Sequence, residues 1–189
     1  KRIFKTINKV SLVVANSLFT KRLVDNLSTQ NTEVKFVYPG VVDFRNHNSS
    51  EVLNITGSPV LLTLARLEKR KGHIFVLQSI KKLKIQYPNI QYIIAGSGSE
   101  KKILQKFVLS NSLSQNVYFV GNVNDDQKKF LFEKTDLMVM PTLDESNNNS
   151  IEGFGIAYLE AAFFGIPSIA SNIGGTSEAV LHNSTGIII

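Results

Sequence analysis

Two glutamates accompany an unusually apolar stretch of this 189-residue chain. In "SIEGFGIAYLEAAFFGIPSIA" (150–170), Glu152 stands just before a predicted helix and Glu160 lies about two turns inside it. Burying an unpaired carboxylate costs several kcal/mol, so each acid must receive hydrogen bonds from another group. Hydroxyl groups of a ligand are one such partner, and Glu152 could also stabilise a developing positive centre. Alternatively, Glu152 only favours the helix dipole and Glu160 is paired with a core lysine or serine.

The residues that follow Glu152 suit the binding of an anion. The glycines among them permit a close backbone approach and unusual dihedral angles. At the start of a helix, where the dipole favours negative charge, we expect outward-pointing amides from Gly153, Phe154, Gly155 and Ile156. Glu160 would follow about 12 Å further along the helix axis, which is a reasonable reach from a phosphate to the hydroxyl pair of a ribose.

A basic loop, "ARLEKRKG", follows a predicted strand. Arg66 leaves the strand end, and Lys71 comes five residues later at the start of a helix. A fork-shaped guanidinium and a compact ammonium beside a helix N-terminus would suit a diphosphate. We expect Lys69 and Arg70 to be exposed, and a solvated basic loop is the alternative interpretation of the whole segment.

Two other loops follow predicted strands and could contact a ligand. "AGSGSEKK" carries half of a dinucleotide-binding fingerprint; a simple tight turn explains it as well, although Gly98 would let a ligand approach the backbone. In "YFVGNVNDD", Asn122 and Val123 could offer backbone groups to a nucleobase. An ordinary turn into a helix capped by Asn124 or Asp125 is the alternative.

These loops belong to a regular alternation of strands and helices. Near-continuous apolar strands separated by amphipathic helices predict a doubly wound parallel sheet, an α/β fold covered on both faces. The predicted strands are 9–15, 33–39, 60–67, 90–96, 116–121, 136–141, 166–171 and 185–189. The predicted helices are 16–28, 71–88, 99–113, 125–135, 153–165 and 175–183.

The alternation divides at a polar, turn-rich segment, residues 40–59, which we interpret as a linker. The strand–helix–strand unit before it has no sheet to join, and the final strand, "TGIII", has no covering helix. We therefore expect a fragment in which residues 1–40 are the tail of one domain and residues 41–189 are most of a second domain, truncated at its end.

The composition restricts the partners and the chemistry. The net charge of +6 favours anionic partners such as phosphorylated small molecules or acidic membrane surfaces. Nucleic acid is not expected, because aromatic and basic residues are not interleaved and no nucleic-acid-binding motif occurs. The chain has no cysteine, and its three histidines lack metal-site spacing, so no metal is expected. Without cysteines, a secretory leader or an apolar run of roughly 18 residues, a cytoplasmic location is predicted.

The paired glutamates also resemble a known signature. "EGFGIAYLE", a glutamate followed by seven residues and a second glutamate, resembles the motif of retaining glycosyltransferases with the GT-B fold, in particular glycosyltransferase family four. "VANSLFTKRLV" and "FVYPGVVDF" resemble the end of the N-terminal domain and the crossover between domains, although Pro39-Gly40 replaces the more usual Asn-Gly. "TLARLEKRKG", "YFVGNV" and "GIPSIASNIGGTSEAV" resemble the phosphate loop, the base-binding loop and the segment after the paired glutamates.

This resemblance implies roles for the matching residues. Arg66 and Lys71 would bind the donor diphosphate, and Glu160 the ribose hydroxyls. Glu152 would lie beside the transferred sugar as the catalytic residue. The other donor-binding positions would be Gly98, Asn122, Val123, Gly153, Phe154, Gly155 and Ile156. Such enzymes work without a metal or another cofactor, and positive groups with the helix dipole would stabilise the departing nucleoside diphosphate.

The resemblance implies transfer of a sugar from a UDP-, GDP- or ADP-linked donor to a hydroxyl acceptor with the anomeric configuration kept. Residues 1–40 would then end the N-terminal acceptor domain, and the fragment would be the donor-binding half, inactive alone. We also expect the acceptor to be a surface polysaccharide or a glycolipid. Peripheral contact of the protein with the inner face of the membrane is a further expectation. The alternatives are a nucleotide-sugar-binding module without transfer activity, a GT-B nucleotide-sugar epimerase, or an interaction domain held at a membrane surface.

Overall fold

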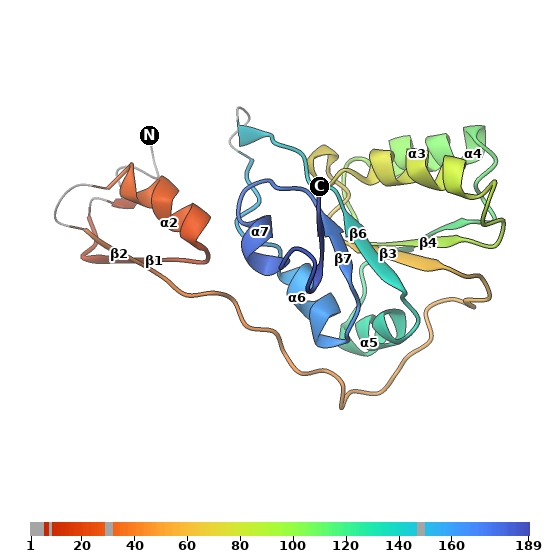
Figure 1. Cartoon of the computed structure of the whole chain (residues 1–189), viewed down its shortest axis with the longest axis horizontal. Helices are drawn as coiled ribbons and strands as arrows, with labels where there is room; N and C mark the ends of the chain where they lie inside the picture. Colours follow the sequence, from red (N-terminus) through yellow and green to blue (C-terminus); the bar gives the residue numbers. More distant parts are fainter. Residues whose placement is uncertain (1–5, 8, 29–31, 147–149) are drawn as a thin grey trace.

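The computed structural model describes residues 6–7, 9–28, 32–146 and 150–189. These residues form two α/β units (Figure 1). The smaller unit consists of β1 (Leu12–Ala15), α2 (Leu18–Asp25) and β2 (Glu33–Phe36), and its two strands pair in parallel. The connecting residues 37–59 contain no helix or strand, as the linker interpretation predicts.

The larger unit is built on one sheet. Its strands in the described part of the chain are β3 (Val60–Leu64), β4 (Gln91–Ala95), β5 (Val117–Gly121), β6 (Leu137–Met140), β7 (Ser168–Ala170) and β8 (Gly186–Ile188). They are ordered β5-β4-β3-β6-β7-β8, and every neighbouring pair is parallel. The predicted fold class, a doubly wound parallel α/β sheet, is confirmed.

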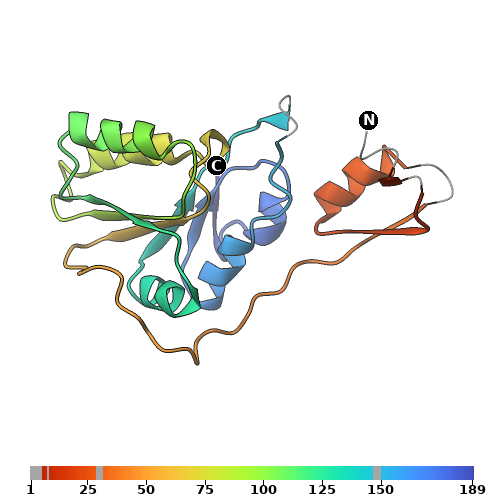
Figure 2. The ribbon, with the colours of Figure 1, turned by 180° about the vertical axis from the view of Figure 1, so that it is seen from behind.

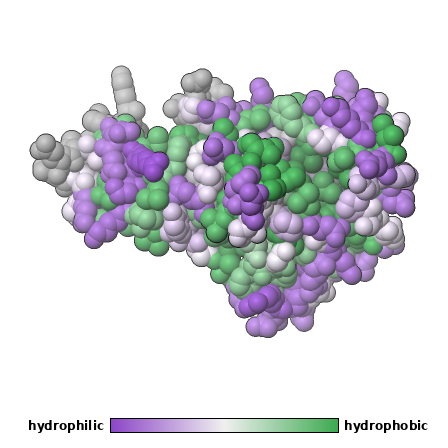
Figure 3. Space-filling view, viewed as in Figure 1, coloured by the Kyte–Doolittle hydropathy of each residue, from purple (hydrophilic) through white to green (hydrophobic). Residues whose placement is uncertain are grey.

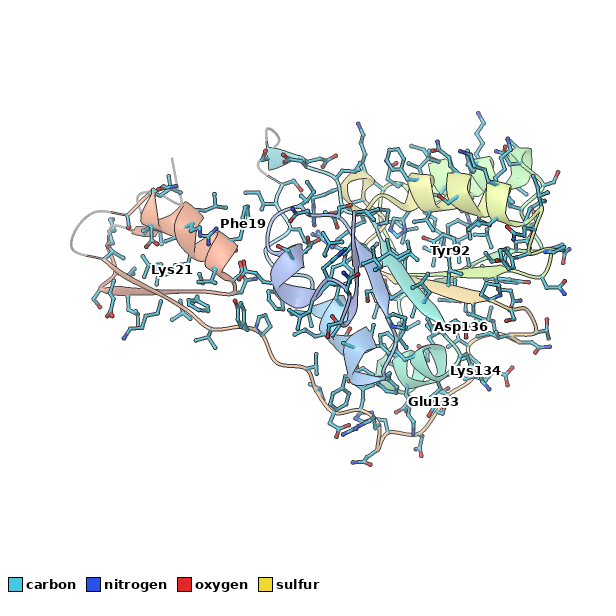
Figure 4. All side chains as sticks on the ribbon, in the orientation of Figure 1. Phe19, Lys21, Tyr92, Glu133, Lys134 and Asp136 are labelled. Carbon is cyan, nitrogen blue, oxygen red and sulfur yellow. The ribbon has the colours of Figure 1, made fainter. Side chains whose placement is uncertain are left out.

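Helices cover the sheet from both sides (Figures 1 and 2). On one side lie α3 (His73–Leu83) and α4 (Lys101–Ser110); on the other lie α5 (Asp125–Glu133), α6 (Ile156–Phe163) and α7 (Thr176–Ala179). Each side has its own hydrophobic core, so both faces of the central strands are buried. Tyr92 of β4 lies between the sheet and α3 (Figure 4), and its hydroxyl shares a 2.8 Å hydrogen bond with that of Thr63.

Local signals explain several helix starts. Ser17 caps α2 by accepting a hydrogen bond from the Thr20 amide, and Asn124 and Gln127 form a capping box at α5. The helix predicted from residue 153 begins later, at Ile156, because Gly155 adopts a left-handed conformation with φ of +97°.

The order of the strands creates a crevice. From β3 the chain builds β4 and β5 on one side, then crosses to place β6 on the other side of β3. Loops after β3 and β6 therefore leave the same edge of the sheet in opposite directions. In open α/β sheets, such a switch point at the carboxyl ends of the strands is where ligands bind.

A large apolar groove of about 530 Å³ lies elsewhere, between α3 and strands β6 and β7. Figure 3 shows hydrophobic residues gathered beside the C-terminus, where this groove opens. It is lined by Leu61, Phe75, Val76, Ser79, Lys82, Leu83, Leu137, Val139, Pro141, Ile169 and Ile189. Because its walls offer few polar groups, the groove does not suit a charged ligand.

The smaller unit contacts the larger one through the start of α2. The Glu178 carboxylate on α7 accepts hydrogen bonds from the amides of Leu18 (2.7 Å) and Phe19 (2.8 Å), the residue labelled on α2 in Figure 4. The ring of Tyr38 packs 5.4 Å, centroid to centroid, from that of Phe154. A carboxylate from one unit therefore satisfies the first amides of a helix in the other.

Replacing Glu178 with alanine should loosen this contact. We expect amide hydrogen exchange at Leu18 and Phe19 to accelerate about five- to tenfold, which corresponds to the roughly 1 kcal/mol that a helix cap contributes. Residue-resolved exchange measured by NMR checks this. The variant Glu51→Ala removes the same charge from an exposed position and serves as the control. Equal exchange rates in the Glu178→Ala variant and the wild type would contradict the role of this carboxylate.

Candidate functional site

A buried ion cluster occupies the crevice between the loops that follow β3 and β6. The side chain of Glu152, in the loop after β6, is 10% exposed. Its Oε2 atom accepts hydrogen bonds from Arg70 Nη1 at 2.6 Å and from Lys71 Nζ at 2.5 Å. Both cations come from a 3₁₀ turn, Lys69–Lys71, in the loop after β3. The cluster therefore joins the two sides of the switch point.

The electrostatics of the cluster keep its carboxylate ionised. Burial raises the pKa of Glu152, but Lys71 and Arg70 together outweigh burial and hold that pKa below its ordinary value. Burial lowers the pKa of Lys71, and the nearby guanidinium of Arg70 adds to this effect while Glu152 opposes it. Arg70 Nη2 also lies 4.0 Å from Glu68 Oε2, and Glu68 pairs with Arg66 as well. Arg66, Arg70 and Lys71 together therefore face two carboxylates, and the remaining positive charge is one that an anionic ligand would neutralise.

Three predicted ligand-binding residues meet in a neighbouring cavity of about 270 Å³ at the carboxyl ends of β3, β4 and β5. Arg66, Asn122 and Val123 line it with Leu64, Ala65, Ala95, Gly96 and Ser97. The Arg66 side chain is 69% exposed, and its Nη1 atom lies 2.6 Å from Glu68 Oε1. This cavity therefore combines an exposed guanidinium with backbone groups from two loops.

Gly98 does not line the cavity. Its backbone instead packs against Leu67, and a Cβ atom at position 98 would lie 2.4 Å from the Leu67 carbonyl oxygen. The close approach between the two loops is the structural reason for glycine at this position. A donor-binding role for Gly98 stays a prediction.

The start of α6 presents open backbone groups beside the ion cluster. Within the part of the chain that the structure describes, no hydrogen-bond acceptor meets the amides of Gly153, Phe154, Gly155 and Ile156. Ile156 is exposed, whereas the Phe154 side chain is buried against Tyr38, so Phe154 can offer a ligand only its backbone. Residues 147–149, within the Asn/Ser-rich stretch that precedes this segment, lie outside the described residues.

Glu160 has a partner in the protein itself. Its Oε1 atom lies 2.8 Å from Lys128 Nζ on α5, and Lys128 also lies 3.5 Å from Asp125. The Glu160 side chain is 12% exposed, so the expectation that it avoids a solvated face is confirmed. The alternative of a core lysine or serine partner is met in part, because Glu160 pairs with a lysine but Lys128 is 22% exposed. The burial of Glu160 alone is therefore no evidence for a bound ribose. The predicted role of Glu160 in binding ribose stays a prediction.

The helix boundary changes the relation between the two glutamates. Because α6 begins at Ile156, Glu160 is its fifth residue and lies in its second turn, while Glu152 lies outside the helix. The estimate of about 12 Å along a helix axis is therefore wrong, because it assumed a helix through all eight steps. Residues 153–155, between Glu152 and the start of α6, are not helical.

Arg70 is buried, contrary to the expectation from the sequence. Lys69 is exposed as expected, but Arg70, expected to be exposed, is 5% exposed. A 3₁₀ turn rotates the chain by about 120° per residue, so adjacent basic residues point in different directions. His73 was not considered for the site, yet it is 2% exposed and its Nε2 lies 3.2 Å from the Arg66 carbonyl oxygen. Its position in the sequence, directly after the basic loop, is the signal that could have identified it as part of the site.

The described residues contain no group of three or more His, Asp or Glu side chains that could hold a metal ion. None of the helices described above has the length and apolar character needed to cross a membrane.

A doubly wound sheet with a cationic crevice at its switch point, and open helix amides beside it, defines an α/β domain suited to a phosphorylated ligand. The sequence profile of the family described as "Glycosyl transferases group 1" matches residues 45–189. The chain belongs to this family of group 1 glycosyl transferases.

The relatives that the chain matches are longer than the matched stretch. A GDP-mannose-dependent alpha-(1-6)-phosphatidylinositol monomannoside mannosyltransferase of Mycobacterium tuberculosis is 30% identical over 131 residues, which cover 69% of this chain and 34% of that protein. A glycogen synthase of the same species is 32% identical over 132 residues, or 70% of this chain and 30% of the relative. The crystal structure of Anabaena Alr3699/HepE with UDP and glucose matches all of this chain and 52% of its own, with a TM-score of 0.82 at 23% identity. The chain thus spans about a third of these two relatives and about half of the solved structure.

The ion cluster should make stability depend on pH. Because the folded-state pKa of Glu152 lies below its unfolded value of about 4.3, its stabilising contribution is present above that value and is lost as the pH falls through the folded pKa. Urea unfolding between pH 3 and 7 should show the free energy of unfolding of the wild type falling, relative to Glu152→Gln, as the pH drops below about 4. Glu51→Gln is the control for removing a carboxylate, and parallel curves for wild type and Glu152→Gln would refute the prediction.

The backbone of Glu152 is held by a glycine turn. Gly174 has φ of +66°, and a Cβ atom there would lie 2.1 Å from the Glu152 carbonyl oxygen, which accepts a hydrogen bond from the Gly175 amide at 3.0 Å. Gly165 has a similar φ of +74° but open space around it. We predict that Gly165→Ala costs about 1 kcal/mol of unfolding free energy and Gly174→Ala at least twice as much. Equal costs in urea unfolding would mean that the backbone contact does not constrain the site.

Proposed function

We propose that this chain is the donor-binding half of a retaining glycosyltransferase of family four, which transfers a sugar from a nucleotide-sugar to a hydroxyl acceptor. The observation that carries the proposal is the Glu152 carboxylate, held by two buried cations beside the open amides of α6. A site of this kind supplies both an acid for the sugar and positive charge for a diphosphate.

The described contacts support a division of roles. Lys71 and the exposed Arg66 bind the diphosphate together with the α6 amides. The cavity beside Asn122 and Val123 receives the base. Glu160 binds the ribose through the oxygen that Lys128 does not contact. Positive groups and the helix dipole stabilise the departing nucleoside diphosphate, so the proposed reaction uses no metal or other cofactor.

Glu152 is the residue proposed to act beside the transferred sugar. Its Oε2 atom is held by the two cations, while its Oε1 atom has no partner among the described residues. The free oxygen can accept hydrogen bonds from sugar hydroxyls, and its negative charge favours positive charge that develops at the anomeric carbon.

The rest of the enzyme is proposed from the resemblance and the relatives. In this proposal residues 1–40 belong to the N-terminal acceptor domain and residues 41–189 to the C-terminal domain; the separate small α/β unit and the connecting residues 37–59 support this division. The acceptor is a glycan or glycolipid, with peripheral contact at the cytoplasmic face of a membrane. A relative named for GDP-mannose and a structure with UDP make both nucleotides the first probes.

Calorimetry with UDP, GDP, ADP and their sugars tests the proposal. The wild-type chain should bind at least one of them and show no robust transfer alone. Arg66→Ala and Glu160→Ala should each weaken binding about tenfold or more, since a hydrogen bond to a charged group contributes about 1.5–3 kcal/mol. Lys106→Ala, at an exposed position on α4, controls for the loss of a charge. If both site variants bind as tightly as Lys106→Ala, the residue assignment fails; if the wild type binds no nucleotide, the proposed function fails.

A further inference from the structure

One carboxylate oxygen in the crevice serves two cations. Arg70 Nη1 and Lys71 Nζ both contact Glu152 Oε2, at 2.6 and 2.5 Å. A buried carboxylate needs a cationic partner, but one well-placed partner satisfies that need. The second cation is therefore available for another anion. The remaining question is which cation keeps its contact with Glu152 and which one binds the ligand.

We propose that Arg70 is a positioning residue that holds Glu152 and thereby releases Lys71 to bind the diphosphate. This inference rests on the proposed function, because it concerns the same site. Arg70 does not touch the ligand in this scheme. It acts through Glu152, whose charge would otherwise keep Lys71 engaged in an internal ion pair.

The setting of Arg70 favours a fixed role. Its carbonyl oxygen accepts a hydrogen bond from the Leu143 amide at 2.8 Å, which ties its backbone to the loop after β6. Its side chain is 6% exposed and contacts Glu152 from the same loop. Backbone and side chain thus both join the two sides of the crevice. A guanidinium is planar and permanently charged, so it remains a partner for a carboxylate at every relevant pH.

The setting of Lys71 favours a change of partner. Its ammonium is a compact charge on a flexible stem, with three donors that can point in different directions. One of these donors reaches Glu152, and the excess positive charge of the cluster favours an incoming phosphate. With Arg70 in place, Lys71 can turn toward that phosphate without leaving Glu152 unpaired. Without Arg70, the ligand would have to compete with Glu152 for Lys71.

A double-mutant cycle with free nucleoside diphosphates tests this scheme. UDP and GDP lack the sugar that Glu152 is proposed to contact, so their affinity reports on the phosphate site. We expect Arg70→Gln to weaken binding at least tenfold. Lys69→Gln removes the same charge from the exposed side of the same turn and should have a much smaller effect. Adding Glu152→Gln to Arg70→Gln should restore most of the affinity, because a neutral side chain no longer retains Lys71.

The cycle gives an answer even if Arg70→Gln does not fold, which circular dichroism and urea unfolding would reveal. The comparison is then between Glu152→Gln and the double variant, which has no buried carboxylate to leave unpaired. The affinities of these two variants should differ by no more than the small change that Lys69→Gln causes. A further tenfold loss in the double variant would mean that Arg70 binds the ligand directly and would overturn the inference.

Two other results are informative. Wild-type affinity in a folded Arg70→Gln variant would overturn the inference and leave the proposed function intact. Failure of the wild type to bind any nucleoside diphosphate would overturn both. Arg70→Lys, which keeps the charge, should retain more affinity than Arg70→Gln; equal losses would show that charge at this position does not hold Glu152.

Discussion

The structure depends on keeping a charged carboxylate in a buried crevice. A carboxylate at the position of Glu152 is tolerated only because Arg70 and Lys71 reach it from the opposite loop. In the loop after β3, a 3₁₀ turn meets this requirement: Arg70 and Lys71 both reach Glu152 Oε2 from it, while Lys69 stays exposed. The backbone of the acid is held as well, because the Gly175 amide donates a hydrogen bond to the Glu152 carbonyl oxygen and Gly174 packs against that oxygen.

The second acid, Glu160, is also paired with a lysine. Glu160 lies on α6 and meets Lys128 from α5, so each glutamate of the pair has a lysine supplied by a different element. The two ion pairs differ in surroundings, because Lys71 is buried and Lys128 is partly exposed. Both carboxylates are therefore held by partners within the protein, so the ligand binding proposed above requires Lys71 to change partner but leaves the two acids in place.

The sequence was sufficient for the fold and for part of the site. Apolar strands alternating with amphipathic helices predict the parallel sheet, and Asn124, one of the two cap positions considered, caps α5. Arg66, Asn122 and Val123 meet in one cavity because parallel strands bring their following loops to one edge. The direction of Arg70 could not be predicted, since periodicity carries no signal in a three-residue turn. The partner of Glu160 depends on how α5 packs on α6, which is a tertiary contact that no local pattern encodes.

The distance in sequence between the cluster's members has a consequence for how the protein folds. Arg70 and Glu152 are 82 residues apart in the sequence. The crevice between them is complete only after β6 has paired with β3. Contacts between such distant residues form late, because closing a long loop is entropically costly. A chain emerging from the ribosome would expose the basic turn well before its acid is made. During that interval Arg70 and Lys71 lack the carboxylate that pairs with them in the completed sheet.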